Sequence, residues 1–266
     1  RELSLEASLR GTHFLDPERR SRWSLSPSAT FRYSLHEAGS LSLTAGAATQ
    51  YLFQTGVTNL GFPCEFWFLA GSHADPQSSI YGIFGYNGEF SGSMYSVRAD
   101  LYYRQLLGQV EYNGDILDFI SGNYDLDRSL LKGSGRNFGL SLMLHKQAGK
   151  LTGWAAYTLG RSLRSFDVPG YAGEYPSNHE RLHEFNLVAA WNARKWSAGL
   201  SMVAAGGIPF TAPDSFYVIG DRIVSHYRSH NSNRLAPYFR ADLSFNWYFV
   251  RSASRTFRPT SSSPRW

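Results

Sequence analysis

The sequence predicts an all-β fold: an antiparallel meander of about ten long strands that forms part of a transmembrane β-barrel. Two observations carry this prediction. Apolar and polar residues alternate with a period of two over long stretches, the clearest being Tyr238–Phe249. Short and long connections between these stretches alternate along the chain. Together they indicate one sheet whose two ends differ in kind.

The connections differ in length in a regular way. Short connections, each compatible with a tight turn, fall at His36–Gly39, Ser91–Ser93, Ala148–Lys150 and Asn192–Lys195. Long connections fall between them, at Thr55–Ser79, Gly108–Ser134, Arg164–Glu180 and Gly206–Leu235. Successive connections of a meander lie at opposite ends of the sheet, so one end carries turns and the other carries loops. A barrel that crosses a membrane shows this asymmetry, and a soluble sandwich has no reason to.

The strands follow from the alternation, in chain order. Alternating stretches include Glu2–His13, Arg22–Leu35, Ser40–Ala47, Tyr95–Arg104, Asn137–His145, Phe185–Trp191 and Tyr238–Phe249. The last places Phe239, Leu243 and Phe245 opposite polar neighbours. Its twelve residues span about 40 Å at ~3.3 Å each. That length exceeds a typical globular strand of ~5–6 residues and is enough for the ~9–11 residues that cross a bilayer.

Composition excludes several other classes. Mean hydropathy is −0.31, and the sequence has no long apolar run, which excludes a helical membrane protein. Charged residues make up only 18 % of the chain. Four arginines in the last sixteen residues account for most of the net charge of +5, so no basic face for nucleic acid is expected. Cys64 is the only cysteine and leaves the redox compartment open.

Several aromatic residues fall near predicted strand ends, where an interfacial girdle would place them. They are Trp23, Tyr51, Tyr81, Trp154, Trp191, Trp196 and Tyr248.

One motif could indicate a metal site. His179–His183 reads H-E-x-x-H, which binds zinc when a helix brings both imidazoles onto one ion. Pro176 precedes it and strand alternation follows, so the histidines of an extended segment would be about 13 Å apart. We therefore predict a polar loop edge leading into a strand, with no metal and no cofactor.

Two further patterns fail on spacing. Gly133–Gly135 with Gly139 resembles a dinucleotide loop, but a strand follows instead of a helix. Four aspartates of one long connection lack the calcium-loop pattern and are expected to be solvated: Asp115, Asp118, Asp125 and Asp127. No local signature of a catalytic triad is present, so no catalytic residue and no enzyme activity are predicted.

An ordered series of segments resembles the C-terminal barrel of TonB-dependent outer-membrane receptors. The segments are Gln109–Tyr112, Tyr124–Asp127, Leu151–Trp154, Tyr175–Arg181, Gly207–Thr211, Asn233–Tyr238 with Arg240 and Asp242, and the loop Gly56–Trp67 followed by Pro76 and Gln77. The resemblance covers most of Glu2–Phe249. The family's plug, TonB box and last strands have no counterpart here, and residues 251–266 form a basic Ser/Pro-rich tail that we expect to be disordered. Residues 1–250 are then a partial barrel.

The resemblance implies a function. It implies an outer-membrane receptor that takes up a scarce nutrient, such as a siderophore, a glycan or a peptide, with outer-membrane lipid and a TonB-type energy-coupling protein as partners. A surface ligand-capture lipoprotein is a further expected partner. Candidate ligand contacts on the long loops are Glu65, Phe66, Trp67, Tyr171, Tyr175 and Phe210. As a fragment with two open strand edges, the chain alone is expected not to transport.

Two alternatives remain open from the sequence. One is a self-contained ten-stranded outer-membrane barrel, such as an omptin-like surface protease, which would need lumen-facing Asp and His pairs. The other is a soluble all-β binding module, whose apolar strand faces would be covered by a second layer.

Overall fold

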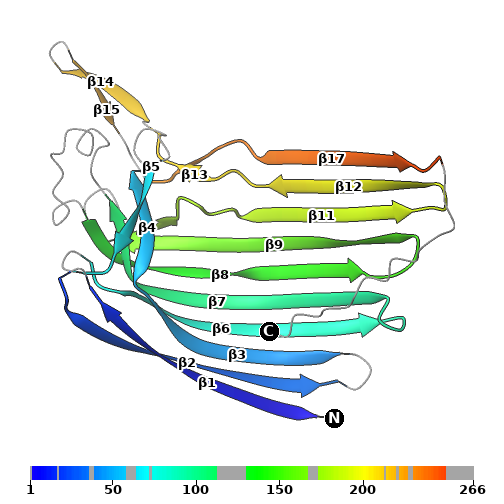
Figure 1. The fold of residues 1–266 in the computed structure, drawn as a ribbon. Coiled ribbons are helices and arrows are strands. Elements are labelled where there is room, and N and C mark those ends of the chain that lie inside the picture. The colour runs from blue at the N-terminus through cyan, green and yellow to red at the C-terminus, as the bar shows by residue number, and fades with distance from the viewer. Residues whose placement is uncertain are drawn as a thin grey trace.

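The computed structural model describes residues 2–16, 18–35, 39–57, 64–71, 74–112, 130–166, 173–212, 214–219, 222–226 and 230–249. They form strands without helices. Ten strands pair in the order β1-β2-β3-β6-β7-β8-β9-β11-β12-β17 as one curved antiparallel sheet (Figure 1). The predicted meander of about ten long strands is therefore confirmed. The tail at 251–266 lies outside the described residues.

The ten long strands overlap the alternating stretches of the sequence, and β7 extends beyond them at its end and β8 at its start. The ten strands are β1 (Leu3–Leu15), β2 (Ser21–Ser34), β3 (Ser40–Gln50), β6 (Gln77–Phe90), β7 (Tyr95–Tyr112), β8 (Leu130–Lys146), β9 (Leu151–Phe166), β11 (His183–Asn192), β12 (Trp196–Ala205) and β17 (Tyr238–Trp247). Shorter strands are β4 (Leu52–Val57), β5 (Cys64–Leu69), β10 (Glu174–Pro176), β13 (Pro209–Phe210), β14 (Ser215–Ile219), β15 (Arg222–His226) and β16 (Asn233–Arg234).

The two ends of the sheet differ as predicted. The β2–β3, β6–β7, β8–β9 and β11–β12 connections are short and lie at one end, which we name the turn end. The long connections lie at the opposite end, which we name the loop end (Figure 1).

All four predicted long connections contain strand residues. Gly108–Ser134 overlaps the end of β7 and the start of β8, and Arg164–Glu180 overlaps the end of β9 and contains β10. The connection at Thr55–Ser79 contains the β4–β5 hairpin and the start of β6, and the one at Gly206–Leu235 contains β13 to β15 and β16. The strands β4, β5 and β13 to β16 span only two to six residues each, which is too short to show a clear period of two. Alternation alone therefore missed them.

Register places two continuous rows of apolar residues on one face of the sheet. One row runs across neighbouring strands as Leu5, Phe31, Leu43, Phe84, Leu101, Leu140 and Leu159. The next row towards the turn end includes Tyr33, Leu41, Tyr86, Ala99, Leu142, Tyr157, Phe185, Ala204 and Phe239. A slip of one residue in any strand would break these rows. We name this side the apolar face and the other side the polar face.

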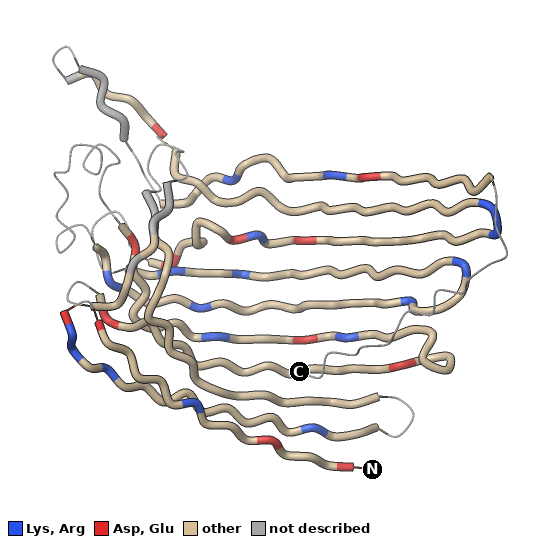
Figure 2. Tube along the Cα trace, viewed as in Figure 1, with Lys and Arg blue, Asp and Glu red and all other residues tan. Residues whose placement is uncertain are grey.

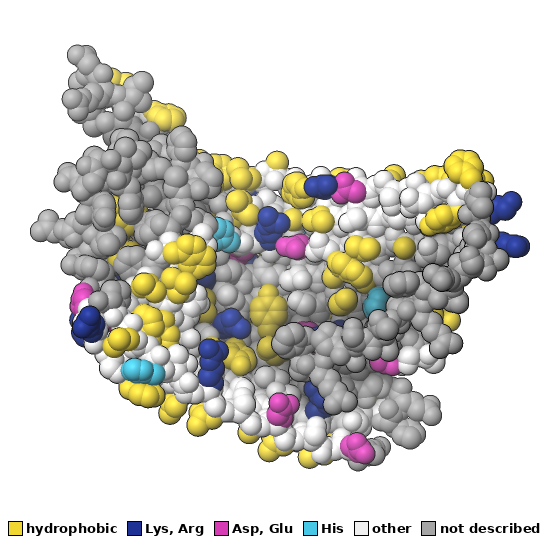
Figure 3. Space-filling model, viewed as in Figure 1, with side chains coloured by type: hydrophobic (Ala, Val, Ile, Leu, Met, Phe, Trp, Pro, Cys, Tyr) yellow, Lys and Arg dark blue, Asp and Glu magenta, His cyan; other side chains and the backbone are white. Residues whose placement is uncertain are grey.

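Burial is inverted relative to a water-soluble sheet. In β2 the residues of the apolar face are exposed, whereas the serines and Thr30 between them are partly buried. Leu43 is 55 % exposed and Leu243 is 84 % exposed. Figure 3 shows hydrophobic side chains at the surface over β1, along the lower edge of the view. No second layer of described residues covers the apolar face, so a soluble module with buried strand faces is not what this fold builds.

Charges are sparse along the strands. Figure 2 shows long uncharged runs in each strand, with charged residues spaced widely between them. On the polar face Arg98 donates to Asp100 at 2.6 Å and Arg240 donates to Asp242 at 2.8 Å. Such pairing within one strand neutralises these two arginines of the polar face.

The sheet is open at both sides. Within the described chain, β1 pairs only with β2 and β17 pairs only with β12. One edge of each strand therefore presents free backbone N–H and C=O groups. Such groups cannot remain unpaired in hydrocarbon, so further strands must pair with them in a membrane.

A glycine in the middle of β8 permits close strand packing. A Cβ atom on Gly139 would lie 2.3 Å from the Leu159 carbonyl oxygen and 2.7 Å from the Tyr102 hydroxyl. We expect Gly139→Ala to destabilise the folded chain by about 1–3 kcal/mol, because the backbone of β9 must move. Urea unfolding in detergent measures the change. Gly82→Ala is the matched control, since a Cβ there meets nothing within 4 Å, and equal losses for both variants would contradict this account.

The β1–β2 connection is closed by Asp16. Its buried carboxylate accepts hydrogen bonds from the Arg20 backbone N–H at 2.7 Å and from the Arg20 guanidinium at 2.9 Å. Burial raises the pKa of Asp16, but these bonds outweigh it and hold the pKa below its ordinary value. The stabilisation is therefore complete above the unfolded pKa of ~3.9 and is lost as the pH falls through the lower folded pKa.

This sign gives a pH prediction. Hydrogen exchange of the Arg20 amide should stay protected near neutral pH and lose protection when the solution is acidified below the range of ordinary carboxyl groups. Asp16→Asn should weaken protection at neutral pH and remove most of its dependence on pH. Protection that rose on acidification would show that the sign is wrong.

Candidate functional site

The polar face carries an aromatic core at the loop end. Phe53, Ala70, Ala74, Tyr112 and Leu130 are buried together, and partly buried Phe14, Tyr51 and Val110 pack against them. The rings of Phe14 and Tyr51 stack with centroids 4.5 Å apart. The β4–β5 hairpin brings Phe53 to this core, which joins the ends of several long strands. The loop end is thus a packed platform.

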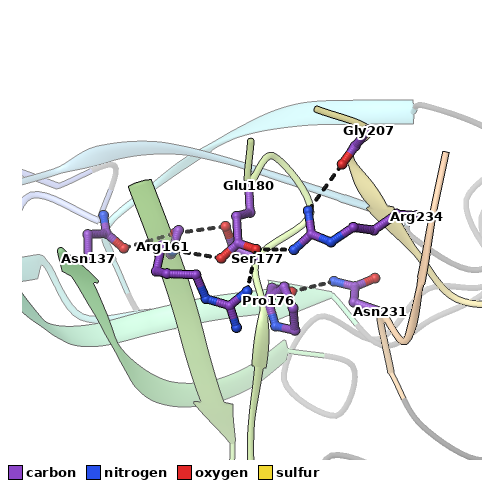
Figure 4. Close-up of polar contacts among 9 residues, drawn as sticks. Asn137, Arg161, Pro176, Ser177, Glu180, Gly207, Asn231 and Arg234 are labelled. Atoms are coloured by element: carbon purple, nitrogen blue, oxygen red, sulfur yellow. Dashed lines mark hydrogen bonds and ion pairs between the residues drawn. The ribbon is translucent and has the colours of Figure 1, made fainter. Parts of the chain in front are cut away.

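Glu180 is the centre of a buried polar cluster beside this platform (Figure 4). Its carboxylate accepts from the Ser162 backbone N–H at 2.8 Å and from Arg161 at 3.4 Å, and it forms an ion pair with Arg234. The side chain is only 1 % exposed. Between β10 and β11 the chain leaves the edge of β9, and this carboxylate satisfies the β9 N–H that the gap exposes.

A second buried carboxylate belongs to Glu111, at the end of β7. The Tyr175 hydroxyl donates to it at 2.7 Å, and His230 Nε2 lies 2.9 Å from its other oxygen. The rings of Tyr175 and His230 meet edge to face, with centroids 4.6 Å apart. Three segments distant in sequence therefore converge on one carboxylate.

Asn231 joins the same two loops. Its side-chain amide donates to the Pro176 carbonyl oxygen at 2.8 Å and to Asn178, and its backbone N–H donates to the Thr211 hydroxyl at 3.0 Å. We name His230, Asn231 and Arg234 the clasp, because they fasten the connection before β17 to the connection before β11. The polar side chains around the clasp are hydrogen-bonded or ion-paired to one another. None of the residues named in this cluster is an activated nucleophile.

The H-E-x-x-H segment does not form the helix that the zinc motif requires. His179 lies in a turn and His183 begins β11, where its Nδ1 lies 2.8 Å from the Tyr157 hydroxyl. Glu180 between them is bound by arginines. The predicted loop edge leading into a strand is confirmed. No group of three metal-ligating His, Cys, Asp or Glu side chains occurs among the residues that the structure describes.

The six predicted ligand contacts are not brought together as one group. Trp67 is 66 % exposed on the β4–β5 hairpin, and the side chains of its neighbours Glu65 and Phe66 lie outside the described parts, as does Tyr171. Tyr175 is only 6 % exposed, because it packs beneath the clasp. Phe210 is half-buried in β13, opposite Asn233 of β16. Trp67 is therefore the exposed member, and Tyr175 supports the loops.

Sequence reasoning missed the residues that organise the loop end. They are Glu111, Glu180, His230, Asn231 and Arg234. A partial signal existed, since Glu111 and Glu180 are acidic residues next to strand ends in long connections. Several of their contacts join segments more than fifty residues apart in the chain, such as Glu180 with Arg234 and Glu111 with Tyr175, and no periodicity links such segments.

The aromatic girdle is confirmed in part. At the turn end, Trp196 stacks with Trp191 at 6.4 Å between centroids and with Phe245 at 5.8 Å. The register places these rings on the apolar face, where an interfacial girdle belongs. The prediction is wrong for Trp154 and Tyr81, which pair with His145 and Arg104 on the polar face. A position near a strand end does not by itself determine whether an aromatic side chain lies on the apolar or the polar face.

The fold of this chain is similar to parts of two solved receptor structures. The ferric-catecholate import receptor Fiu from E. coli K12, in its closed form, matches with a TM-score of 0.56 and 16 % identity over 87 % of this chain. The ferripyoverdine receptor of the Pseudomonas aeruginosa outer membrane, bound to ferripyoverdine, matches with a TM-score of 0.61 and 13 % identity over 93 %. The fold is that of part of a TonB-dependent receptor barrel.

The chain spans 30 % and 31 % of the lengths of these two receptors. No protein-family model matches the sequence, and no curated protein matches it. None of the described residues belongs to a helix long and apolar enough to cross a membrane.

The described aspartates give no support to a surface protease. Asp16 is bound by Arg20, Asp100 by Arg98 and Asp242 by Arg240. The carboxylate beside a histidine is Glu111, which is buried and also bound by Tyr175. A general base on this fold would need an open carboxylate or imidazole that reaches a substrate.

Proposed function

We propose that this chain forms part of the wall of an outer-membrane receptor that takes up a scarce nutrient. The observation that carries the proposal is the exposed apolar face, which continues in register across ten strands. In a membrane this face lies against lipid, and the polar face lines an enclosed space. The nutrient is a metal–siderophore complex, a glycan or a peptide, and uptake is energised by a TonB-type protein.

The loop end faces the outside of the cell in this proposal, since barrels of this kind place short turns at the periplasmic rim. Trp67 is then the first candidate for ligand contact, because its exposed indole can stack on a ligand. Glu65, Phe66 and Tyr171 remain proposed contacts beside it. Tyr175, which is buried, and Phe210, which is half-buried, also remain proposed contacts. A surface lipoprotein that delivers the ligand is a further proposed partner at this end.

Fractionation and uptake test the proposal. The intact protein that contains this chain should fractionate with the outer membrane. A deletion strain should lose growth on one member of a panel of ferric siderophores, glycans and peptides supplied as sole source. Loss of the energy-coupling protein should abolish the same growth. Recovery in the periplasm, or growth that does not depend on energy coupling, would overturn the proposal.

A further inference from the structure

The clasp fastens the base of a projecting hairpin. Strands β14 and β15 pair from Ser215 to His226 and project past the loop end of the sheet (Figure 1). Thr211 precedes this hairpin and His230 follows it. The Thr211 hydroxyl lies 3.3 Å from His230 Nδ1, accepts from the Asn231 backbone N–H and donates to the Asn231 side-chain oxygen at 3.4 Å. The two legs of the hairpin are therefore tied together at their base.

The three clasp residues also bind the base of the hairpin to the long sheet and its loops. His230 reaches Glu111 of β7, Asn231 reaches Pro176 of β10, and Arg234 reaches Glu180, which is bonded to β9. These attachment points lie on three different segments. A body fixed at three separated points cannot rotate about any one of them. The orientation of the hairpin base is thus fixed relative to the long sheet.

Asn231 occupies the central position of the clasp. It is 3 % exposed, and its φ of 51° lies in the left-handed region, which asparagine tolerates better than most residues. Both its amide nitrogen and its amide oxygen are hydrogen-bonded. A substitution that changes either the shape of this side chain or its donors and acceptors should therefore weaken the clasp.

We infer that Asn231 is a positioning residue that holds the β14–β15 hairpin in one direction at the loop end. Among its described side chains, those of Phe216, Tyr217 and Val218 are all exposed. The direction of the hairpin is a property of the fold and does not depend on the nutrient. Its consequence for capture does rest on the proposed function, because the hairpin then stands at the outer entrance.

A distance measurement tests the inference. Spin labels on Val218→Cys and Lys132→Cys, in a Cys64→Ser background, report the direction of the hairpin relative to β8. The original clasp should give a narrow distance distribution. Asn231→Asp should broaden it, because a carboxylate cannot donate to Pro176 or Asn178. Asn231→Gly should broaden it as well, although glycine keeps the left-handed backbone.

Matched variants separate positioning from folding. Thr211→Val removes the hydroxyl at nearly constant shape and should broaden the distribution, whereas Thr211→Ser keeps the hydroxyl and should leave it narrow. Asn246→Asp, at the turn end, should also leave it narrow. Urea unfolding should show that the long strands of Asn231→Gly remain folded, while proteolysis within the hairpin accelerates about tenfold or more, as expected when buried partners are lost.

Two outcomes overturn the inference. One is a narrow distribution in both Asn231→Asp and Asn231→Gly, which would show that the hairpin is held elsewhere. The other is a broad distribution in the original chain. Neither readout requires a ligand, so a failure of the uptake experiment would leave this result standing, and the reverse also holds.

Discussion

Leu43→Arg is expected to destabilise the folded protein in lipid bilayers by about 2–4 kcal/mol, the cost of an arginine at the lipid face near mid-membrane. Leu43 is 55 % exposed in the middle of the apolar face, between Phe31 and Phe84. At an exposed position in water the same change would stay within about 0.5 kcal/mol. Urea unfolding from lipid vesicles distinguishes these values.

Ser42→Arg is the matched control. Ser42 is the next residue of β3, faces the polar side and lies opposite Gly85 of β6. An arginine there faces other polar groups. Its like charge opposite Arg32 of β2 adds only about 0.2–1 kcal/mol, so an effect well below that of Leu43→Arg is expected. Equal costs for Leu43→Arg and Ser42→Arg would contradict the assignment of the two faces.

Glu180→Ala is expected to lower the free energy of unfolding of the loop end by about 2–4 kcal/mol. Breaking a fully buried ion pair costs ~3–5 kcal/mol, and the partial exposure of both arginines reduces that figure. The change also leaves the Ser162 N–H without its acceptor. Hydrogen exchange of Ser162, followed with urea concentration, measures the loss.

Glu174→Ala provides the comparison within the same connection. Glu174 forms an ion pair with Arg136, but both side chains are 42 % exposed, so the expected cost is only about 0–1 kcal/mol. If Glu174→Ala proved as costly as Glu180→Ala, burial would not be what gives the Glu180 cluster its strength.

The long strands could be predicted from the sequence because one physical rule governs them. Side chains of a strand alternate between two faces, so a sheet with one apolar environment and one polar environment needs a period of two. Leu41, Leu43 and Ala45 obey this rule, and their partners in β2 and β6 obey it in register. The short turns could be predicted for a related reason, since the alternation of these strands breaks off where the chain reverses between them.

The loop end could not be predicted in the same way. Glu180 meets Arg234 across more than fifty residues, and Glu111 meets His230 across more than a hundred. These pairings depend on where two loops fold back over the sheet. Tyr175 illustrates the limit: an aromatic residue in a long loop predicted a ligand contact, but the structure buries it beneath the clasp.

The β14–β15 hairpin shows a second limit. Phe216, Tyr217 and Val218 are consecutive and all exposed, so this part of β14 shows no period of two. A short two-stranded hairpin is also only marginally stable by itself. Its base is fixed by Thr211 and Asn231, which the sequence does not mark as partners.

The account depends most on which side of the sheet meets lipid, and β17 offers a direct measurement. Spin labels placed one at a time from Phe239 to Asn246, in vesicles, would be tested against oxygen dissolved in lipid and a nickel chelate dissolved in water. We predict alternation with a period of two: oxygen should reach Phe239, Leu243 and Phe245, and the chelate should reach Arg240, Asp242 and Ser244. Equal access of the chelate to both sets would contradict the account.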